Sequence, residues 1–239
     1  MNVAVLSDIH GVRPALEAVL AEPDVRAADR IGLLGDLLAG PMPVETLERL
    51  QALGDRAVWV RGNADREPAE SARTGGSFVP DPIFPWAARQ LRPADLPVLD
   101  ALPLTVTLGE VLFCHATPRD DAEIVLVDSS PQRWAEVPAG VSAPTVVCGH
   151  THLQFARFAD RRLVVNPGSV GMPYGARGAH WALLGEGVQL RRTEYDAEAA
   201  CRYLTSRSAY PDIEEYFVRN PASDVEALRV FSGRGTSST

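Results

Sequence analysis

The sequence predicts an α/β protein, and three observations support that class. The first 62 residues alternate short apolar segments with amphipathic ones, in the order strand, helix, strand, helix, strand. The second half of the chain is rich in short β-branched segments that end in glycine-containing turns. With 239 residues, of which 46% are hydrophobic and 23% charged, the chain can bury a sizeable core and has the composition of an ordinary globular protein.

The N-terminal part is predicted to form a mainly parallel sheet covered by helices. The predicted strands are NVAVLS (2–7), RIGLLGD (30–36) and RAVWVRGN (56–63), and the predicted helices are GVRPALEAVLAE (11–22) and PVETLERLQALG (43–54). In the first helix Pro14 suits the first turn, while Leu16, Val19 and Leu20 are spaced to face a core. Strands that alternate with helices in this way favour parallel pairing, because each helix carries the chain back to the same edge of the sheet.

Residues 65–103 are predicted to form a helical insertion over the sheet, because they are rich in proline and contain short helical fragments but no clear strand. The later predicted strands are a hairpin at 104–115, which turns at Gly109–Glu110, and segments at 143–150, 153–158, 161–169 and 180–192. We expect this half to be largely antiparallel and residues 196–219 to be helical. Residues 1–231 are therefore interpreted as a single domain, and the low-complexity residues 232–239 as a flexible tail.

Charge and cysteine content exclude several classes of function. The formal net charge of −8 leaves no basic surface for a nucleic acid or an anionic membrane. Cys114, Cys148 and Cys201 are too widely spaced for a CxxC metal site or a disulfide framework, which favours reduced, buried thiols. The short apolar run before Asp8 is neither a signal peptide nor a membrane span, so we expect a cytoplasmic protein. An acidic protein that handles phosphates needs positive charge from a few arginines or from metal ions.

Polar side chains that can bind a metal follow five of the predicted strands. In chain order they are Asp8 and His10, then Asp36, then Asn63 and Asp65, then His115, and finally His150 and His152. Four of the five histidines belong to this set, and only His180 does not. Ligands of open α/β sheets bind at the carboxyl ends of strands, so we expect these groups to converge in space.

The spacing and the chemistry of these groups favour a site with two metal ions. Residues two apart point to the same side of an extended backbone, so Asp8 and His10, or His150 and His152, can approach one ion as a pair. For the two later histidines, exposed loop positions are the alternative. Imidazole, carboxylate and amide groups without an obvious thiolate favour Mn, Fe, Zn, Co or Ni ions over Ca²⁺ or a structural zinc. Even without Asp65, seven such groups exceed what one tetrahedral ion needs, which favours two ions sharing a carboxylate over a one-metal site.

Six segments resemble, in order, the motifs of the calcineurin-like metallophosphoesterases: SDIHG, LLGD, VRGNAD, FCHATPRD, CGHTH and VVNPGSVG. The similarity spans roughly residues 2–205 and is closer to the bacterial branch that includes diadenosine-polyphosphate hydrolases and small phosphodiesterases. It implies a sandwich of two mixed β-sheets flanked by helices. It also implies two divalent or trivalent transition-metal ions, with Mn or Fe favoured. By this resemblance one ion would be held by Asp8, His10 and His152, the other by Asn63, His115 and His150, with Asp36 bridging the two.

The resemblance further implies hydrolysis of phosphodiester or phosphoanhydride bonds by in-line attack of a metal-bridging hydroxide. The implied catalytic residues are Asp36, Asn63, Asp65 and His115. Many family members carry a histidine after the asparagine, which is thought to help protonate the leaving group, but here that position is Ala64. General acid help is typically worth about 10²–10⁴-fold, so its loss favours anhydrides and activated diesters over unactivated monoesters. Asp65 could take over part of that task or could orient His115, and both readings stay open.

Contacts to a substrate are less clearly marked than the metal ligands. Arg61, Arg119 and Arg177 could clamp a phosphate, although a surface arginine is more often solvated. Tyr174 could stack on a base or serve packing, and Asn166 is expected to fix a turn rather than to touch substrate. We expect a small phosphorylated, nucleotide-like substrate as the partner, with no membrane and no stable nucleic-acid binding. The alternatives are a non-catalytic metal-binding or scaffolding protein on the same fold, and a phosphomonoesterase or protein phosphatase.

Overall fold

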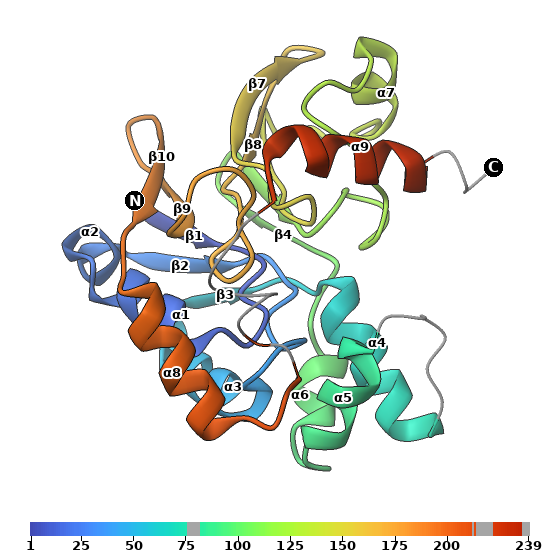
Figure 1. Ribbon diagram of the computed structural model, residues 1–239. Coiled ribbons are helices and arrows are strands. Elements are labelled where there is room, and N and C mark those ends of the chain that lie inside the picture. Colours follow the sequence, from blue (N-terminus) through green and yellow to red (C-terminus); the bar gives the residue numbers. More distant parts are fainter. Residues whose placement is uncertain (76–81, 212, 214–221, 236–239) are drawn as a thin grey trace.

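In the computed structural model the chain folds into two five-stranded β-sheets that pack face to face and are flanked by helices (Figure 1). The structure describes residues 1–75, 82–211, 213 and 222–235. The first sheet contains β1 (Val3–Leu6), β2 (Arg30–Leu33), β3 (Ala57–Trp59), β9 (Ala179–Leu184) and β10 (Val188–Thr193). The second contains β4 (Thr105–Leu108), β5 (Val111–Cys114), β6 (Thr145–Val147), β7 (Phe155–Ala159) and β8 (Arg162–Asn166). The predicted sandwich of two mixed sheets is confirmed.

The strand–helix alternation predicted for the N-terminal part is confirmed, since β1, β2 and β3 pair in parallel and helices connect them. The helices of the described chain are α1 (Arg13–Ala21), α2 (Pro23–Ala27), α3 (Pro43–Gln51), α4 (Asn63–Thr74), α5 (Ile83–Gln90), α6 (Leu96–Asp100), α7 (Pro131–Glu136), α8 (Ala197–Arg207) and α9 (Asp224–Gly235), with a 3₁₀ turn at Gly54–Arg56. Proline stands in the first turn of α1, α2 and α3, where its missing N–H has no helical partner to lose. The short helix α2 was not expected, although Pro23 marks its start.

The second sheet has the strand order β4-β5-β6-β8-β7. The predicted hairpin of β4 and β5 is confirmed, and Gly109 at its turn has a φ of 58°. The second half of the chain is largely antiparallel, as expected, since β4–β5, β7–β8, β9–β10 and β1–β9 pair in this way, but β5, β6 and β8 run parallel to one another. The cause is the long segment between β5 and β6, which contains α7 and crosses over the sheet instead of turning back.

The first sheet is completed by the last two strands of the chain. Its order is β10-β9-β1-β2-β3, and β9 pairs antiparallel with β1 and with β10. The first sheet therefore combines a parallel half, made early in the chain, with an antiparallel half made late.

The helical insertion predicted at 65–103 is confirmed by α4, α5 and α6, while residues 76–81 lie outside the described residues. The helix predicted at 196–219 ends earlier, because α8 stops at Arg207 and residues 208–211 are not helical; residues 212 and 214–219 lie outside the described residues. Of the predicted tail at 232–239, residues 232–235 belong to α9, which is anchored by buried Ala227 and Phe231, and residues 236–239 lie outside the described residues. No helix in the described part of the chain is long and apolar enough to cross a membrane.

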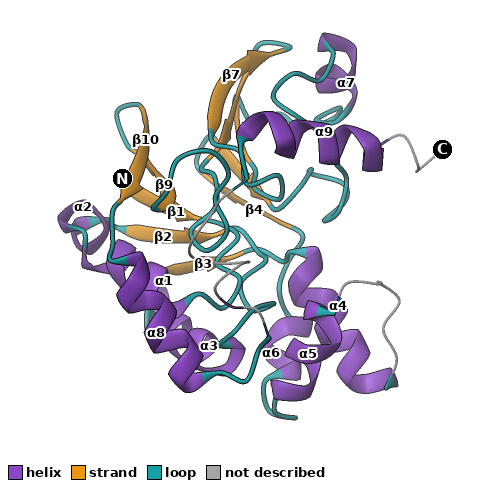
Figure 2. Cartoon of the chain, viewed as in Figure 1, coloured by secondary structure: helices purple, strands orange, loops and turns teal. Residues whose placement is uncertain are grey.

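Alternating side chains divide the core into layers. Val3 and Val5 of β1 point towards the other sheet, whereas Ala4 and Leu6 point towards the helices. Between the sheets they meet Phe113 of β5, together with apolar residues of β6 and β8. Helices α1, α3 and α8 cover the outer face of the first sheet, and α7 packs on the outer face of the second (Figure 2). This packing fixes the two sheets relative to each other, and with them the loops that leave their strands.

Replacing Phe113 by alanine is expected to destabilise the protein by about 3–5 kcal/mol, because its side chain is 1% exposed and fills the layer between the sheets. Chemical denaturation followed by circular dichroism measures the change in the free energy of unfolding. The matched control is Phe158→Ala, since Phe158 is 77% exposed and its loss should change stability by no more than about 0.5 kcal/mol. Equal losses for the two variants would contradict the assignment of the layer between the sheets as a packed core.

Candidate metal centre

The metal-binding side chains expected at the strand ends lie at the carboxyl ends of β1, β2, β3, β5 and β6. Six of them fall into two groups, within each of which the possible ligand atoms lie no more than 4.8 Å apart. The first group is Asp8, His10 and His152, and the second group is Asp36, His115 and His150. Loops from both sheets therefore meet at one place, as the strand-end pattern predicts.

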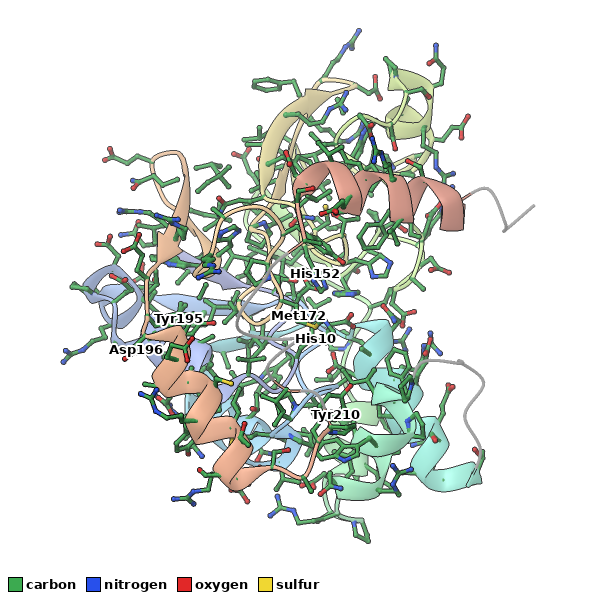
Figure 3. The ribbon with its side chains drawn as sticks, in the orientation of Figure 1. His10, His152, Met172, Tyr195, Asp196 and Tyr210 are labelled. Atoms are coloured by element: carbon green, nitrogen blue, oxygen red, sulfur yellow. The ribbon has the colours of Figure 1, made fainter. Side chains whose placement is uncertain are left out.

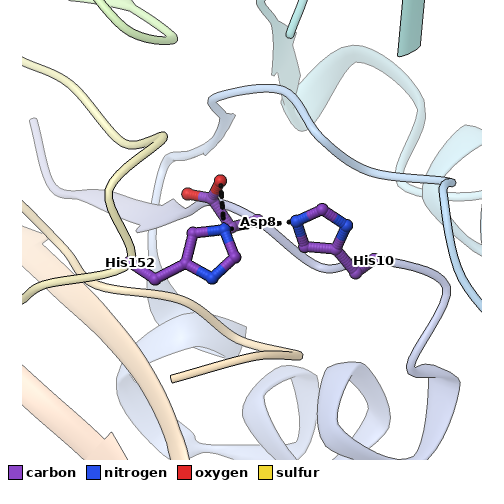
Figure 4. A group of neighbouring side chains, drawn as sticks. All are labelled: Asp8, His10 and His152. Carbon is purple, nitrogen blue, oxygen red and sulfur yellow. Dashed lines mark hydrogen bonds and ion pairs between the residues drawn. The ribbon is translucent and has the colours of Figure 1, made fainter. Parts of the chain in front are cut away.

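The first group joins two loops of different sheets (Figure 4). Oδ1 of Asp8 lies 3.2 Å from Nε2 of His152, which in turn lies 3.2 Å from Nε2 of His10. The other oxygen of Asp8, Oδ2, accepts hydrogen bonds from the hydroxyl of Ser7 at 2.5 Å and from the backbone N–H of His150 at 3.1 Å. The protein thus fixes one carboxylate oxygen and turns the other towards the two imidazoles.

Asp36 lies between the two groups. Its Oδ1 is 3.2 Å from Nε2 of His115, and its Oδ2 is 3.8 Å from Nε2 of His10. The backbone N–H of Ala64 donates to Oδ1 at 2.7 Å and holds the carboxylate in place. The ring of His150 completes the second group, with its centroid 5.1 Å from that of His115. One carboxylate therefore reaches a histidine of each group.

Asn63, the first residue of α4, directs its carboxamide at the second group. With the amide turned to satisfy its polar atoms, its nitrogen donates to Nδ1 of His150 and to the carbonyl oxygen of Asp121, each at 3.2 Å. The opposite orientation presents the amide oxygen, which is a suitable ligand for a hard or borderline cation. Asn63 is thus placed to serve either as a donor or as a ligand.

Backbone carbonyls orient three of the four histidines. Nδ1 donates to the carbonyl oxygen of Ala39 in His10 (2.9 Å), of Leu34 in His115 (2.6 Å) and of Met172 in His152 (2.7 Å). Figure 3 shows His10, His152 and Met172 beside one another. Because a carbonyl oxygen can only accept, a neutral ring carries its proton on Nδ1 and directs the lone pair of Nε2 into the site. Metal-binding histidines are oriented in the same way.

The site brings buried acceptor atoms face to face. Oδ1 of Asp8 and Nε2 of His115 are buried, and neither forms a hydrogen bond with any described residue. Oδ1 of Asp8 lies 3.2 Å from Nε2 of His152, and Nε2 of His115 lies 3.2 Å from Oδ1 of Asp36. In each pair the two lone pairs repel each other unless a positive charge stands between them. A buried polar atom without a partner costs about 1–3 kcal/mol. The donor set therefore fits metal ions, which supply that charge to several ligands at once.

The pKa values of the histidines reflect the same need for positive charge. Burial alone would lower the pKa of His115, yet the carboxylate 3.2 Å away raises it to about 10. The carboxylate of the first group likewise raises the pKa of His152 against the effect of burial. Burial lowers the pKa of His10, and burial together with the charge on His115 lowers the pKa of His150 to about 4. Cations that bind here must displace protons from His115 and His152.

Five of the candidate ligands have left-handed backbone. The φ angles are 54° for Asp8, 49° for His10, 51° for Asp36, 67° for His150 and 56° for His152. In the described chain the other non-glycine residues with positive φ are Asp160 and Arg161, in the hairpin turn between β7 and β8. Such conformations cost about 1 kcal/mol or more each and cluster at functional sites.

This backbone corrects one inference from the sequence. Spacing in an extended chain predicts that His150 and His152 approach the same ion, but the two residues belong to different groups. The left-handed turns at both positions rotate the side chains apart, so the rule for extended backbone does not apply. The division of the two histidines implied by the family resemblance is the one observed.

Two glycines allow the backbone to approach the carboxylates closely. A Cβ atom at Gly62 would lie 2.2 Å from Oδ1 of Asp36, and one at Gly149 would lie 2.7 Å from Oδ2 of Asp8. Both distances are below the 3.0 Å that real Cβ contacts essentially never cross. The glycines of the VRGN and CGHTH segments are therefore part of the construction of the site.

The NPGS segment braces the loop that carries two of the histidines, as predicted. The side-chain nitrogen of Asn166 donates to the carbonyl oxygen of Gly149 at 2.7 Å, and its oxygen accepts from the N–H of Gly168 at 2.8 Å. The hydroxyl of Ser169 donates to the carbonyl oxygen of Asp8 at 2.7 Å. The segment thus ties the loops after β1 and β6 to each other without entering the site.

Asp65, which the resemblance places among the catalytic residues, is engaged by the backbone. Its Oδ1 accepts from the N–H of Leu37 at 2.8 Å, and its Oδ2 accepts from the N–H of Gly62 at 3.0 Å. Burial and the charge of Asp36 raise the pKa of Asp65 to about 7, although these two donors oppose the shift. The Nδ1 atom of His115 bonds a backbone carbonyl instead of Asp65. The geometry gives Asp65 the task of joining the loops after β2 and β3.

The arginines considered as phosphate clamps already have partners. Nε of Arg61 lies 2.9 Å from Oδ2 of Asp121, and Arg119 lies 2.5 Å from Glu123. Asp121 also binds Arg66, at 3.0 Å, which the sequence did not single out. Arg177 lies in the loop before β9, where its carbonyl oxygen accepts a hydrogen bond from Arg192. Arg61 and Arg66 form an ionic cluster with Asp121, next to Asn63, whereas Arg119 is held on a different carboxylate.

Two aromatic rings lie beside the two groups. The ring centroid of Tyr174, which the sequence singled out, is 5.6 Å from that of His152. The centroid of Phe231 in α9 is 6.4 Å from that of His150, and it was not expected at the site. The apolar spacing of Ala227, Leu228 and Phe231 is a signal for an amphipathic helix, but it does not reveal where that helix docks.

A two-sheet sandwich whose strand ends carry two histidine–aspartate groups is the arrangement expected of the metal-dependent phosphoester hydrolases. A family model described as the calcineurin-like phosphoesterase superfamily domain matches residues 1–186. The chain belongs to the calcineurin-like phosphoesterase superfamily, which confirms the family and the enzyme class predicted from the motifs.

Similar proteins agree with this assignment. An uncharacterized protein of Methanocaldococcus jannaschii is 27% identical over 233 residues, which cover 83% of this chain and 89% of that protein. Phosphodiesterase YfcE of Escherichia coli (strain K12) is 28% identical over 197 residues, covering 79% of this chain and 89% of the relative. A metallophosphoesterase from Sphaerobacter thermophilus superposes with a TM-score of 0.71 at 25% identity, over 86% of this chain and 94% of that one. A hypothetical protein from Pyrococcus horikoshii OT3 shares the fold, with a TM-score of 0.78 at 20% identity, over 92% of this chain and 99% of the other.

Substituting Gly62 by alanine is expected to weaken Mn²⁺ binding by about 10–100-fold, because the new methyl group displaces Asp36. Bound metal per chain, measured by mass spectrometry after equilibration with Mn²⁺, tests this without reference to activity. Gly187→Ala is the matched control, since a Cβ atom there meets nothing within 4 Å. Wild-type metal content in a folded Gly62→Ala variant would show that the position of Asp36 does not control binding.

Proposed function

We propose that this phosphoesterase hydrolyses phosphodiester or phosphoanhydride bonds of a nucleotide-like substrate with the help of two metal ions. The observation that carries the proposal is the position of Asp36, whose two carboxylate oxygens face histidines of different groups. The 28% identity to a protein named as a phosphodiesterase supports the choice of diesters over monoesters. The acidic net charge of −8 supports a role for bound cations, because they supply positive charge that attracts a phosphate to an acidic chain.

The residues of each group would hold one ion. In this assignment the first ion takes Asp8, His10 and His152, the second takes Asn63, His115 and His150, and Asp36 is shared. Imidazole, carboxylate and amide donors suit Mn, Fe, Zn, Co and Ni, of which Mn and Fe are the first candidates. When bound, such ions polarise the phosphate and lower the pKa of a coordinated water.

The residues around the ions hold this arrangement rigid. Backbone carbonyls fix the Nε2 atoms of His10, His115 and His152 towards the site, so that the rings need not reorganise when the reaction proceeds. The N–H of Ala64 fixes Asp36 in the same way. Five of the six side chains of the two groups are buried and His150 is half-buried, which limits the freedom of the rings to move.

The proposed substrate class follows from Ala64, the residue beside Asn63, because it cannot act as a general acid. Ala64 is 1% exposed, packs into the apolar cluster on the helix side of the first sheet, and has no proton to donate. Both oxygens of Asp65 are taken up by backbone N–H groups. A leaving group at this site must therefore depart largely unassisted, which favours nucleotide phosphates and other weakly basic groups.

A non-catalytic scaffold on the same fold has less support. All seven ligand positions carry competent groups, and five of them are held in an unfavourable left-handed backbone. A scaffold would gain nothing from that strain.

Hydrolysis of bis-p-nitrophenyl phosphate is expected to require added Mn²⁺, to stop on chelation and to resume when metal is restored. Asp36→Ala should lower kcat/KM by about 10²–10³-fold or more, because the shared carboxylate is lost. Asp55→Ala is the control, since Asp55 is exposed and precedes β3 at the opposite end of the strand. Equal inactivity of the metal-loaded wild type and Asp36→Ala would favour the scaffold.

Substrates are expected to rank by the stability of their leaving groups. On protein of known metal content, dinucleoside polyphosphates, cyclic nucleotides and p-nitrophenyl diesters should outpace a phosphoserine peptide by about 10²-fold or more, because no general acid stands at Ala64. The measurement is kcat/KM for each substrate under one set of conditions. Fastest turnover of the phosphoserine peptide would overturn this substrate class and favour a protein phosphatase.

A further inference from the structure

The C-terminal helix α9 contributes to an apolar cluster at the edge of the metal centre. The buried members of this cluster are Leu126, Leu153, Ala227 and Phe231, and Ile124, Tyr174 and Leu228 pack against them. The cluster lies apart from the layer between the sheets and from the layers under the other helices. The family match ends at residue 186, so α9 and its aromatic side chain lie outside that match.

Two rings of this cluster contact one another and the histidines of both groups. The centroids of Tyr174 and Phe231 are 6.1 Å apart, with the ring planes at 83°, which is an edge-to-face contact. Tyr174 lies 5.6 Å from the ring of His152, with the planes only 30° apart, and Phe231 lies 6.4 Å from the ring of His150. We call Tyr174 and Phe231 the aromatic wall.

An ionic cluster also borders the site. Beside Asn63, the carboxylate of Asp121 joins Arg61 and Arg66 at 2.9–3.0 Å, and the backbone carbonyl of Asp121 accepts a hydrogen bond from the Asn63 amide. The surroundings of the two groups therefore include an apolar surface next to His150 and His152 and a charged one next to Asn63.

We propose that the aromatic wall binds the nucleobase of the substrate, which makes Phe231 and Tyr174 specificity-determining residues. This inference rests on the proposed function, since it assumes that a phosphate is held at the two groups. A base attached to that phosphate gains stacking and apolar contact on the wall. Any base offers a flat apolar face, so the wall selects for a base over a simple sugar or alkyl group and not for one base over another.

Simple packing of α9 is the competing explanation for Phe231. Its side chain is 6% exposed, and that burial alone would help to anchor the helix. The two explanations differ in what they require of position 231. Anchoring needs an apolar side chain of similar volume, whereas stacking needs a ring.

The experiment compares AMP with ribose 5-phosphate, which has the same phosphate and sugar but no base. Calorimetric titration of the Mn²⁺-loaded full chain gives the dissociation constant of each ligand for the wild type, Phe231→Leu, Tyr174→Leu and the control Val230→Ala. Val230 lies on the same helix and is 51% exposed. Phe231→Leu and Tyr174→Leu should each weaken AMP binding by about 10-fold and leave ribose 5-phosphate unchanged. Val230→Ala should change neither, and Phe231→Tyr, which keeps the ring, should bind AMP like the wild type.

Three results would overturn the proposal: wild-type AMP affinity in Phe231→Leu, equal changes for both ligands, or tighter binding of both ligands. The last would show that Phe231 merely covers the centre. Thermal unfolding of each variant shows whether the helix remains packed. Hydrolysis of bis-p-nitrophenyl phosphate by the same wild-type sample separates the two levels of inference. Turnover without tighter binding of AMP than of ribose 5-phosphate would contradict base binding by the aromatic wall and leave the proposed function standing. An inert wild type would contradict the proposed function itself.

Discussion

The candidate metal centre depends on one electrostatic constraint, which is that buried carboxylate oxygens and imidazole lone pairs face each other across about 3 Å. Asp8 faces His152 and Asp36 faces His115, in each case at 3.2 Å. Acceptors so placed are stable together only with positive charge between them, from protons or from metal ions. The raised pKa of His115 shows that a proton can supply this charge, and the family's dependence on metals indicates that metal ions supply it as well. The rest of the fold can be understood as the means of holding these atoms in that unfavourable proximity.

Holding them there requires a backbone that departs from regular structure only at the strand ends. Two packed sheets supply rigid strands, and the loops after β1, β2 and β6 take left-handed conformations at five of the candidate ligands. Backbone hydrogen bonds continue the pairing of β1 and β2 into these loops, from Asp8 to Gly35 and from His10 to Asp36. Asn166 and Asp65 brace the loops from outside with their side chains. The strain of the left-handed backbone is therefore balanced by a network of hydrogen bonds, which holds the loops of the candidate ligands in place without filling the site.

Much of the fold and the convergence of the candidate ligands could be predicted from the sequence, because strand ends and side chains able to bind metals are local signals. What could not be predicted depends on three-dimensional context. The split of His150 and His152 between the groups follows from left-handed φ angles, which residue spacing does not encode. The parallel pairing of β6 with β5 and β8 follows from a crossover whose path the chain order leaves open. Phe231 lies at the site because α9 docks there, and an amphipathic pattern identifies a helix but not its destination.

The place of β9 in the first sheet has a consequence for how the protein is made. On the ribosome β1, β2 and β3 emerge early, and the edge of β1 stays unpaired until residues 179–184 have been synthesised. An exposed strand edge of this kind invites association with other chains, which makes the nascent protein a candidate client for chaperones. The histidines at 150 and 152 also arrive after more than half of the chain, so a translation product that ends before them lacks part of the candidate ligand set. The two groups can therefore assemble only after the chain has been synthesised beyond residue 152.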